Sequence, residues 1–227
     1  MIGVLDSGIG GIAALYELKR LYPSEDLIYL ADRENAPYGK KSERELTICV
    51  SRSIKRLTER GADKILIACC TASTVYDLLP SWQRRISTPI IAPAASLAAR
   101  LTKSGEIGVI ATERTVASHA FARSIHASSP EARVRECNAQ SLVELVEGGV
   151  RDGNLTENEK EKIKSLVMPA VGSGTDTLIL GCTHFSHLQR TVGSILGDGV
   201  KLVSPAIEGA RATPKPTGIG TGVIIYL

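Results

Sequence analysis

The stretch Ile65-Leu66-Ile67-Ala68-Cys69-Cys70-Thr71 is an apolar, β-branched run that ends in two cysteines and a threonine. A run of this length and composition predicts a buried strand, and the amphipathic residues after it predict a helix. A similar run, Leu178-Ile179-Leu180-Gly181-Cys182-Thr183-His184, recurs in the other half of the chain. The sequence therefore predicts two cysteines, each placed where a buried strand meets a helix.

The repeat extends outward from these two runs. Ile2-Gly3-Val4-Leu5 resembles Ile107-Gly108-Val109-Ile110, and the first residue of each run precedes its cysteine by 67 and 75 residues respectively. Similar elements in the same order predict two similar parallel-sheet α/β domains related by a pseudo-twofold axis. Ligands bind at the carboxyl ends of strands in open α/β sheets, so an active-site cleft is expected between the domains. The expected domains are residues 1–92 plus 205–227, and residues 93–204.

Short apolar runs alternate with amphipathic segments along the chain, which predicts βαβ units. The expected strands cover residues 2–5, 27–30, 64–68, 90–91, 106–111, 177–180 and 200–203. The expected helices cover residues 11–21, 43–60, 71–79 and 116–125, with others after Pro93 and from about His187. Thr156 and Glu159 form a capping box that opens a further helix, expected to reach about Val171.

Composition excludes several classes of protein. The 227 residues are 43% hydrophobic, and the net charge of +3 comes from scattered side chains, so nucleic acid is not an expected partner. The N-terminus has no signal-peptide pattern, and no apolar run approaches the roughly 18 residues that span a bilayer, so no membrane association is expected. The five cysteines include no C-x-x-C pair. We therefore expect free thiols in a reducing cytoplasm and no metal site.

The two cysteines suggest a reaction. A thiol at a helix N-terminus is expected to have a lowered pKa, and the backbone N–H groups there, with the hydroxyls of Thr71 and Thr183, suit a substrate carboxylate. The alternative is that Cys69 and Cys182 are small buried apolar residues, and their matched settings favour function. Moving a proton from one face of a carbon to the other needs two acid/base groups, which titrate as a coupled pair. This racemase chemistry needs no cofactor.

Other polar residues are placed to support this chemistry. Asp6 ends the first strand, where it is expected to tune Cys69 or contact a substrate ammonium group, and Ser7 lies beside it as a donor. His184 follows Cys182 by two residues and is expected to exchange a proton on that side. Tyr38 lies in a turn from which it would reach a ligand. Asp6 and His184 would otherwise cap loops and helices.

A rival motif is present in the first domain. Gly8-x-Gly10-x-x-Ala13 follows a strand and opens a helix, and Asp32 comes 19 residues after Ala13, which matches a dinucleotide-binding fingerprint in spacing. Against this reading, Asp6 would place a carboxylate beside the pyrophosphate. The nucleotide hypothesis also leaves both cysteine elements unexplained, so it is the weaker one.

Five motifs, taken in order, resemble the glutamate racemase family of the aspartate/glutamate racemase superfamily. They are Asp6-Ser7-Gly8-x-Gly10-Gly11, Pro37-Tyr38-Gly39, Ala68-Cys69-x-Thr71-Ala72, Ala111-Thr112-x-x-Thr115-Val116 and Gly181-Cys182-Thr183-His184. Each motif is weak alone, but the ordered set is highly specific. It covers the chain to about Val203.

This resemblance implies a cofactor-independent isomerase that interconverts L- and D-glutamate and supplies D-glutamate for peptidoglycan, hence for cell-wall biogenesis and cell shape. It implies that Cys69 and Cys182 are the two catalytic bases, with Asp6 and His184 in supporting catalytic roles. The residues that match substrate-binding positions are Asp6, Ser7, Tyr38, Gly39, Cys70, Thr71, Thr115, Glu147, Thr183 and His184. A small-molecule substrate and a homodimer are expected.

Three departures from the family pattern keep alternatives open. Cys70 stands where the family normally has Asn, which removes an amide that would bind substrate and adds a thiol beside Cys69. Val203-Ser204-Pro205 replaces the usual Asp-Ser after the valine, and the tail 213–227 does not resemble the family's final helices. The alternatives are a racemase for aspartate or another acidic amino acid, and a binding or regulatory relative with weakened catalysis.

Overall fold

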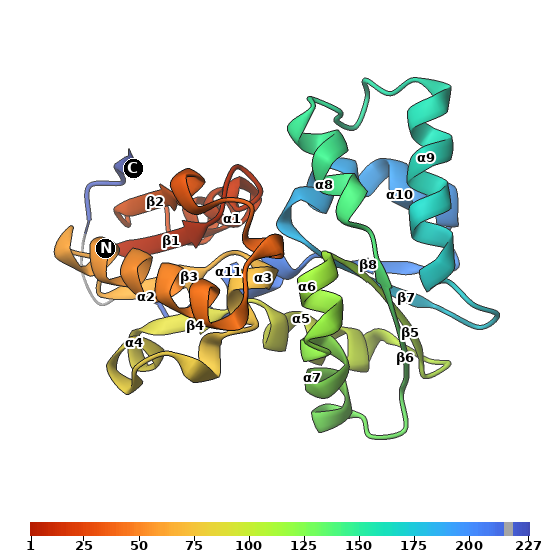
Figure 1. Ribbon diagram of the computed structural model, residues 1–227, viewed down its shortest axis with the longest axis horizontal. Helices are drawn as coiled ribbons and strands as arrows, with labels where there is room; N and C mark the ends of the chain where they lie inside the picture. The colour runs from red at the N-terminus through yellow and green to blue at the C-terminus, as the bar shows by residue number, and fades with distance from the viewer. Residues whose placement is uncertain (216–219) are drawn as a thin grey trace. The chain divides into compact units, whose positions relative to one another are not determined.

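Two parallel sheets organise the chain in the computed structural model, which describes residues 1–215 and 220–227. Contacts divide the chain into two compact units, Met1–Ile90 with Ala206–Leu227 (unit 1) and Ile91–Pro205 (unit 2). Figure 1 gives the labels of the elements in each unit. That the units are separate domains with the limits expected from the sequence stays a prediction.

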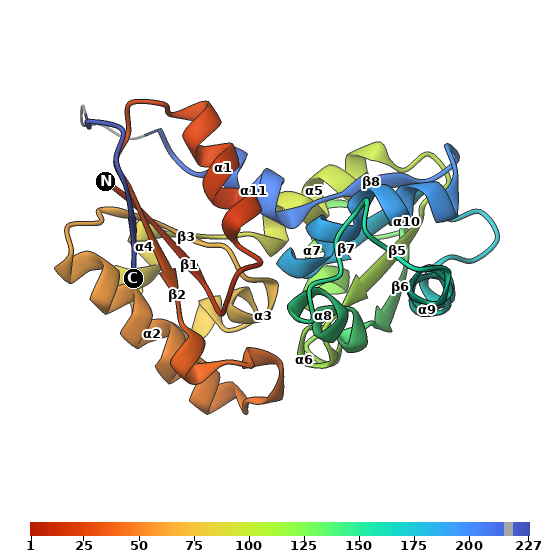
Figure 2. The same ribbon diagram turned by 90° about the horizontal axis from the view of Figure 1, so that it is seen from above.

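Unit 1 contains a five-stranded sheet in the order β4-β3-β1-β2-β9. Its strands are β1 (Ile2–Asp6), β2 (Leu27–Ala31), β3 (Lys64–Ile67), β4 (Ser87–Pro89) and β9 (Ile224–Tyr226). Its helices are α1 (Ile12–Leu21), α2 (Glu43–Glu59), α3 (Cys70–Ser73), α4 (Ser81–Ile86) and α11 (Pro205–Ala212), with 3-10 turns η1 (Arg33–Asn35), η2 (Tyr38–Lys40) and η3 (Tyr76–Leu78). Figure 2 shows α1 and α2 on opposite faces of the sheet.

Unit 2 contains a four-stranded sheet in the order β6-β5-β7-β8. Its strands are β5 (Glu106–Ala111), β6 (Arg133–Asn138), β7 (Thr177–Gly181) and β8 (Lys201–Val203). Its helices are α5 (Ile91–Leu101), α6 (Glu113–Ala117), α7 (Ala120–Ser128), α8 (Gln140–Glu147), α9 (Glu157–Val167) and α10 (Gln189–Leu196), with 3-10 helices η4 (Met168–Ala170) and η5 (Thr183–Leu188).

The two sheets share one topology. The order β4-β3-β1-β2 in unit 1 corresponds to β8-β7-β5-β6 in unit 2, and all of these pairs are parallel. The strand that leads into Cys69 and the strand that leads into Cys182 therefore occupy equivalent places. This confirms the predicted fold class of two similar parallel-sheet α/β parts. The pseudo-twofold axis and the cleft stay predictions.

Helix α2 illustrates how the sequence builds the core of unit 1. Ser42 and Glu45 form a capping box at its start, which satisfies backbone N–H groups that the first turn leaves without partners. Leu46, Val50, Ile54 and Leu57 recur at helical spacing and are buried against the sheet. In unit 2, the predicted capping box of Thr156 and Glu159 is confirmed at the start of α9.

The prediction of a strand at residues 90–91 is wrong. The strand β4 lies three residues earlier, where Ser87, Thr88 and Pro89 pair with β3, and Ile91 already begins α5. Proline is tolerated here because β4 is the edge strand of its sheet. The backbone N–H of Ile90 donates to Oγ of Ser73 instead of to a strand, and the chain turns at this point.

Four of the expected helices differ in extent from the prediction. The segment 71–79 forms α3 and then η3. The segment 116–125 is interrupted at His119, whose φ of 50° is left-handed, and the neighbouring Ser118 hydroxyl accepts from the Ala120 N–H. The α-helix expected from His187 begins at Gln189, after η5, and the helix expected to reach Val171 ends as an α-helix at Val167.

The tail adds an element that the sequence did not predict. Its final strand β9 pairs in parallel with β2, and the Asp26 carboxylate accepts hydrogen bonds from the backbone N–H groups of Thr221 and Val223. Residues 216–219 of the tail lie outside the described residues. Strand β6 and helices α4, α8 and α11 were also not predicted. Across the described ranges, no helix has the length and apolar content needed to cross a membrane.

Candidate active site

Cys69 lies at the carboxyl end of β3 and caps the N-terminus of α3. Its side chain is 6% exposed, and its sulfur accepts from the backbone N–H of Ala72 at 3.5 Å and lies 3.9 Å from Oγ of Ser7. The register of β1 against β3 causes this meeting, because Leu5 pairs with Ile67 and the next residues leave both strands at the same edge. The structure thus brings Asp6, Ser7 and Cys69 together.

The pKa of Cys69 contradicts the prediction that it is lowered. Burial and then the nearby Asp6 carboxylate raise the pKa of this thiol to about 12, although the Ala72 N–H and the Ser7 hydroxyl act in the opposite direction. Helix N-terminal donors are present as expected. They are outweighed because desolvation and a negative neighbour both disfavour the thiolate. At neutral pH, Cys69 is therefore a thiol.

The glycine-rich loop after β1 positions Asp6. The carboxylate of Asp6 accepts a 2.8 Å hydrogen bond from the N–H of Gly8. A Cβ atom on Gly11 would lie 2.7 Å from Cβ of Asp6, so only glycine lets the start of α1 approach this closely. Of the two glycines of the rival nucleotide motif, Gly8 and Gly10, Gly8 therefore contacts Asp6 through its backbone N–H.

Tyr38 is held inside unit 1 by its hydroxyl. The hydroxyl donates to Oδ2 of Asp32 at 2.6 Å, and Nδ2 of Asn35 donates to Oδ1 of the same carboxylate at 2.8 Å. Burial, and then Asp32, raises the pKa of Tyr38 well above its ordinary value. The hydroxyl therefore fixes the 38–40 turn, and with it Gly39. The sequence reading noted Asp32 only within the nucleotide motif and missed this role.

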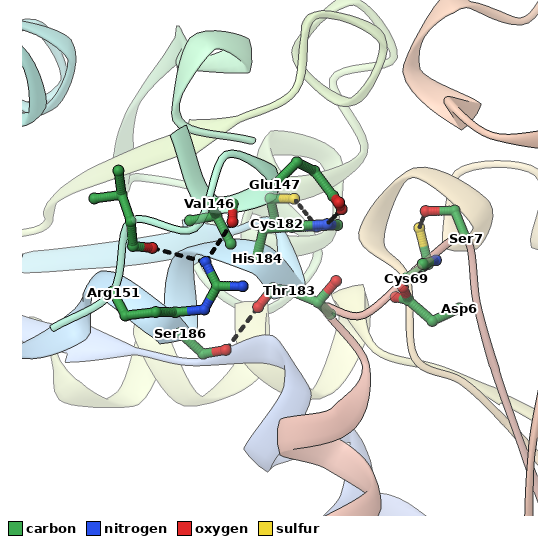
Figure 3. A network of polar contacts seen from close by, with 12 residues as sticks. Asp6, Ser7, Cys69, Val146, Glu147, Arg151, Cys182, Thr183, His184 and Ser186 are labelled. Atoms are coloured by element: carbon green, nitrogen blue, oxygen red, sulfur yellow. Dashed lines mark hydrogen bonds and ion pairs between the residues drawn. The ribbon is translucent and has the colours of Figure 1, made fainter. Parts of the chain in front are cut away.

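Cys182 occupies the equivalent place in unit 2. It follows β7, is 7% exposed and precedes the 3-10 helix η5. Its sulfur lies 3.7 Å from Nδ1 of His184, and Nε2 of His184 lies 2.6 Å from Oε1 of Glu147 at the end of α8 (Figure 3). The structure therefore brings the predicted residues Cys182, His184 and Glu147 together as a line of polar contacts.

The two sulfur atoms have different surroundings in spite of their matched positions. A carboxylate and a hydroxyl, from Asp6 and Ser7, lie beside Cys69. An imidazole backed by a carboxylate, from His184 and Glu147, lies beside Cys182. Shared topology sets where each cysteine lies, and the side chains that surround it set its chemistry.

The remaining predicted residues begin helices at the same edges of their sheets. Cys70 and Thr71 are buried in the first turn of α3, and Thr183 is the buried first residue of η5. Thr115 is fully buried, and its hydroxyl lies 2.9 Å from that of Thr112, the N-cap of α6. In residues 1–215 and 220–227, no group of three or more His, Cys, Asp and Glu side chains is arranged to hold a metal ion.

Comparison with known proteins places this chain in a class. The model of the Asp/Glu/Hydantoin racemase family matches residues 17–213, and the chain belongs to this family. Within it, the chain is similar to glutamate racemases. The glutamate racemase of Desulforudis audaxviator (strain MP104C) is 39% identical, over 93% of this chain and 77% of that protein.

Solved structures agree with this placement. Glutamate racemase isoform RacE1 from Bacillus anthracis is 31% identical with a TM-score of 0.84, over 93% of this chain and 79% of that one. The glutamate racemase from Francisella tularensis subsp. tularensis SCHU S4, determined in complex with D-glutamate, is 31% identical with a TM-score of 0.82, over 92% of this chain and 78% of that one.

Proposed function

We propose that this chain is an amino-acid racemase that interconverts L- and D-glutamate without a cofactor and supplies D-glutamate for peptidoglycan. Its family membership and its similarity to glutamate racemases support this function. The observation that carries the proposal is the equivalent placement of Cys69 and Cys182 after β3 and β7, in two sheets of the same strand order. One reaction centre between two such cysteines would account for the repeat.

The proposed mechanism uses the two cysteines as bases on opposite faces of the α-carbon. One cysteine, as thiolate, takes the α-proton, and the other, as thiol, returns a proton to the opposite face. The two sulfurs exchange protonation states in each turnover, so they titrate as a coupled pair. This requires both sulfurs to reach one substrate.

The surroundings of each sulfur support distinct roles. Burial and Asp6 hold Cys69 as a thiol, and a substrate ammonium group beside Asp6 would offset the charge of that carboxylate and favour the thiolate. On the other side, His184 is placed to exchange a proton with Cys182, and Glu147 orients the imidazole. Asp6 and His184 are therefore proposed as catalytic residues.

Substrate binding is proposed for the residues around these sulfurs. Backbone N–H groups at the starts of α3 and η5, with the hydroxyls of Thr71 and Thr183, would bind the carboxylates of glutamate. The other proposed contacts come from Ser7, Tyr38, Gly39, Cys70, Thr115 and Glu147. Since the Tyr38 hydroxyl donates to Asp32, we assign the contact of this turn to its backbone and Gly39.

The test follows enantiomer conversion directly. Purified protein is incubated with L- or D-glutamate in D₂O, and circular dichroism and mass spectrometry record loss of optical activity and entry of deuterium at the α-carbon. Cys69→Ala and Cys182→Ala should each lose racemisation. Cys137→Ala, a half-buried cysteine on β6, is the matched control and should retain it. Substantial racemisation by either active-site variant would overturn the two-base mechanism.

A substrate panel separates the alternatives that Cys70 keeps open. L- and D-aspartate are compared with L- and D-glutamate, for the native chain and for Cys70→Asn. Faster conversion of aspartate would favour the aspartate racemase hypothesis. Binding of D-glutamate in calorimetry without any racemisation over hours would favour a binding or regulatory relative.

The assembly and the location of the protein complete the proposal. The homodimer is tested by light scattering at micromolar concentration, where a mass of one chain would contradict it. A cytoplasmic location is proposed because the mechanism needs two reduced thiols, which a reducing compartment maintains. A small-molecule substrate is consistent with the relative solved with D-glutamate.

A further inference from the structure

Glu147 lies at the last position of α8, where little packing holds it. Its side chain is 52% exposed, yet Oε1 makes the 2.6 Å contact with Nε2 of His184. Two glycines follow, and Gly149 has a φ of 99°. Since an exposed carboxylate next to a glycine turn has many alternative positions, the backbone at the end of α8 must be fixed for this contact to persist.

Arg151 supplies such a fixed point. Its Nη1 donates to the carbonyl of Val146, in the last turn of α8, and to the carbonyl of Val150 at 2.8 Å (Figure 3). The last turn of α8 contains no basic residue of its own. The Val146 carbonyl also accepts from the backbone N–H of Gly149 at 3.0 Å, so Arg151 adds a second, charged donor to it. A cation at this end interacts favourably with the helix dipole.

The other side of Arg151 is tied to the segment that carries His184. The next residue, Asp152, donates its backbone N–H to the carbonyl of His187 in η5 at 2.9 Å. Its carboxylate accepts from the backbone N–H groups of Arg190 at 2.8 Å and Thr191 at 3.0 Å, at the start of α10. The side chain of Arg151 and the backbone of Asp152 together thus link the end of α8, where Glu147 lies, to η5, where His184 lies.

We propose that Arg151 is a positioning residue of the Cys182 side of the site. By holding the last turn of α8 against η5, it keeps Glu147 in contact with His184, and His184 in turn acts on Cys182. The inference rests on the proposed function for its effect on turnover. Its effect on the reactivity of Cys182 does not depend on any substrate. Small displacements of such groups are costly because proton transfer requires short, aligned contacts.

The experiment compares Arg151→Met and Arg151→Lys with Arg123→Met. Arg123 is the matched control, because its Nη1 also donates to a backbone carbonyl at the end of a helix of unit 2, that of Ser118, the C-cap of α6. Iodoacetamide alkylation of each cysteine is timed by peptide mass spectrometry at neutral pH without substrate. Racemisation of both glutamate enantiomers is measured in parallel.

Arg151→Met should slow alkylation of Cys182 roughly 10-fold and leave that of Cys69 within about two-fold, because the imidazole beside Cys182 would lose the contact with Glu147 that orients it. The kcat of racemisation should fall roughly 10- to 100-fold, and KM should change little. Arg151→Lys should recover part of both losses. Arg123→Met should match the native chain in both the alkylation of Cys182 and the rate of racemisation.

A double-variant cycle separates this role from a general loss of structure. If Arg151 acts through Glu147, then Arg151→Met should add little to the slower Cys182 alkylation of Glu147→Ala. Native alkylation of Cys182 in Arg151→Met, an equal change at both cysteines, or full additivity with Glu147→Ala would overturn the inference. If Arg151→Met fails to fold, Arg151→Lys on the Glu147→Ala background gives the same comparison. A native chain that racemises no glutamate but shows the Cys182 effect would refute the proposed function alone.

Discussion

The hydroxyl of Tyr38 donates a 2.6 Å hydrogen bond to Oδ2 of Asp32, and both side chains are buried. This bond joins the carboxyl end of β2 to the 38–40 turn, within the sheet edge that also carries Asp6 and Cys69. The turn is therefore held by a hydrogen bond inside unit 1.

Replacing Tyr38 with Phe removes this donor and leaves the buried Asp32 with one hydrogen bond fewer. We expect the free energy of unfolding in urea to fall by about 1–3 kcal/mol. The KM for glutamate should rise more than kcat falls, since the turn would lose its position while the sulfurs stay in place. Tyr76→Phe, which removes a partly buried hydroxyl bonded to the Arg84 carbonyl, is the control for KM. An unchanged KM would contradict a positioning role for the bond.

Asp6→Asn is expected to lower the pKa of Cys69 without bringing it down to the ordinary value. The Asp6 carboxylate is the second cause of the raised pKa of about 12, and burial, the larger cause, remains. Thiolate absorbance or the alkylation rate of Cys69, followed from pH 7 to 12, measures the midpoint. Ser7→Ala should move it upward, because the Ser7 hydroxyl favours the thiolate. An unshifted midpoint in Asp6→Asn would remove Asp6 as a cause.

The same raised pKa predicts a loss of stability in alkali. A thiol whose pKa is higher in the folded than in the unfolded state favours folding below the unfolded pKa of about 9, and this contribution is lost as the pH rises toward 12. The unfolding free energy of the native chain should therefore fall between pH 9 and 12 more steeply than that of Cys69→Ala. Equal slopes for the two proteins would show that Cys69 is titrated alike in both states.

Two helical glycines should respond in opposite directions to alanine. A Cβ on Gly209 in α11 would lie 2.1 Å from Cγ2 of Ile90, whereas a Cβ on Gly193 in α10 would meet Leu202 at 3.7 Å. Gly209→Ala should lower the free energy of unfolding by about 1–3 kcal/mol, because the added methyl group overpacks this contact. Gly193→Ala should raise the free energy of unfolding by about 0.5–1 kcal/mol, because alanine has the higher helix propensity. Thermal unfolding of the pair decides this, and a stabilised Gly209→Ala would contradict the close packing.

Asp26→Ala should release the final strand. Hydrogen bonds from the backbone N–H groups of Val223 and Thr221 lower the pKa of Asp26, so its contribution is present above its ordinary pKa near 3.8 and is lost as the pH falls below it. Limited proteolysis near residue 220 should be faster in Asp26→Ala at pH 7. Asp198→Ala, an exposed change in a turn, serves as the control. Equal cleavage of both variants would mean that β9 holds without Asp26.

Much of the fold could be predicted because buried parallel strands have a plain signal. The runs before Cys69 and Cys182 and the runs starting at Ile2 and Ile107 are continuous and apolar, and each was located to within about a residue. Strand β6 was missed because its sequence Arg133–Asn138 alternates charged and half-buried residues at a sheet edge. Strand β9 was missed because hydrogen bonds from a distant residue, Asp26, hold its start.

The site could be predicted as a set of residues but not as an electrostatic environment. The sequence paired Asp6 with Cys69 and His184 with Cys182, and each pair lies together in its unit. The predicted direction of the shift in the Cys69 pKa was wrong. The burial of a sulfur and the side chains that face it depend on the packing of the whole unit, which the local sequence does not reveal. For the same reason the sequence did not reveal that Asp32 accepts a hydrogen bond from Tyr38.

The unlike neighbours of the two sulfurs have a kinetic consequence. Enantiomers are equal in free energy, so kcat/KM must be identical for the forward and reverse conversions whatever the enzyme. Individual kcat values are free to differ, and with a carboxylate facing one sulfur and an imidazole the other, they should follow different pH curves. A protein with two similar halves would then convert its two mirror-image substrates at different maximal speeds, in a ratio that changes with pH.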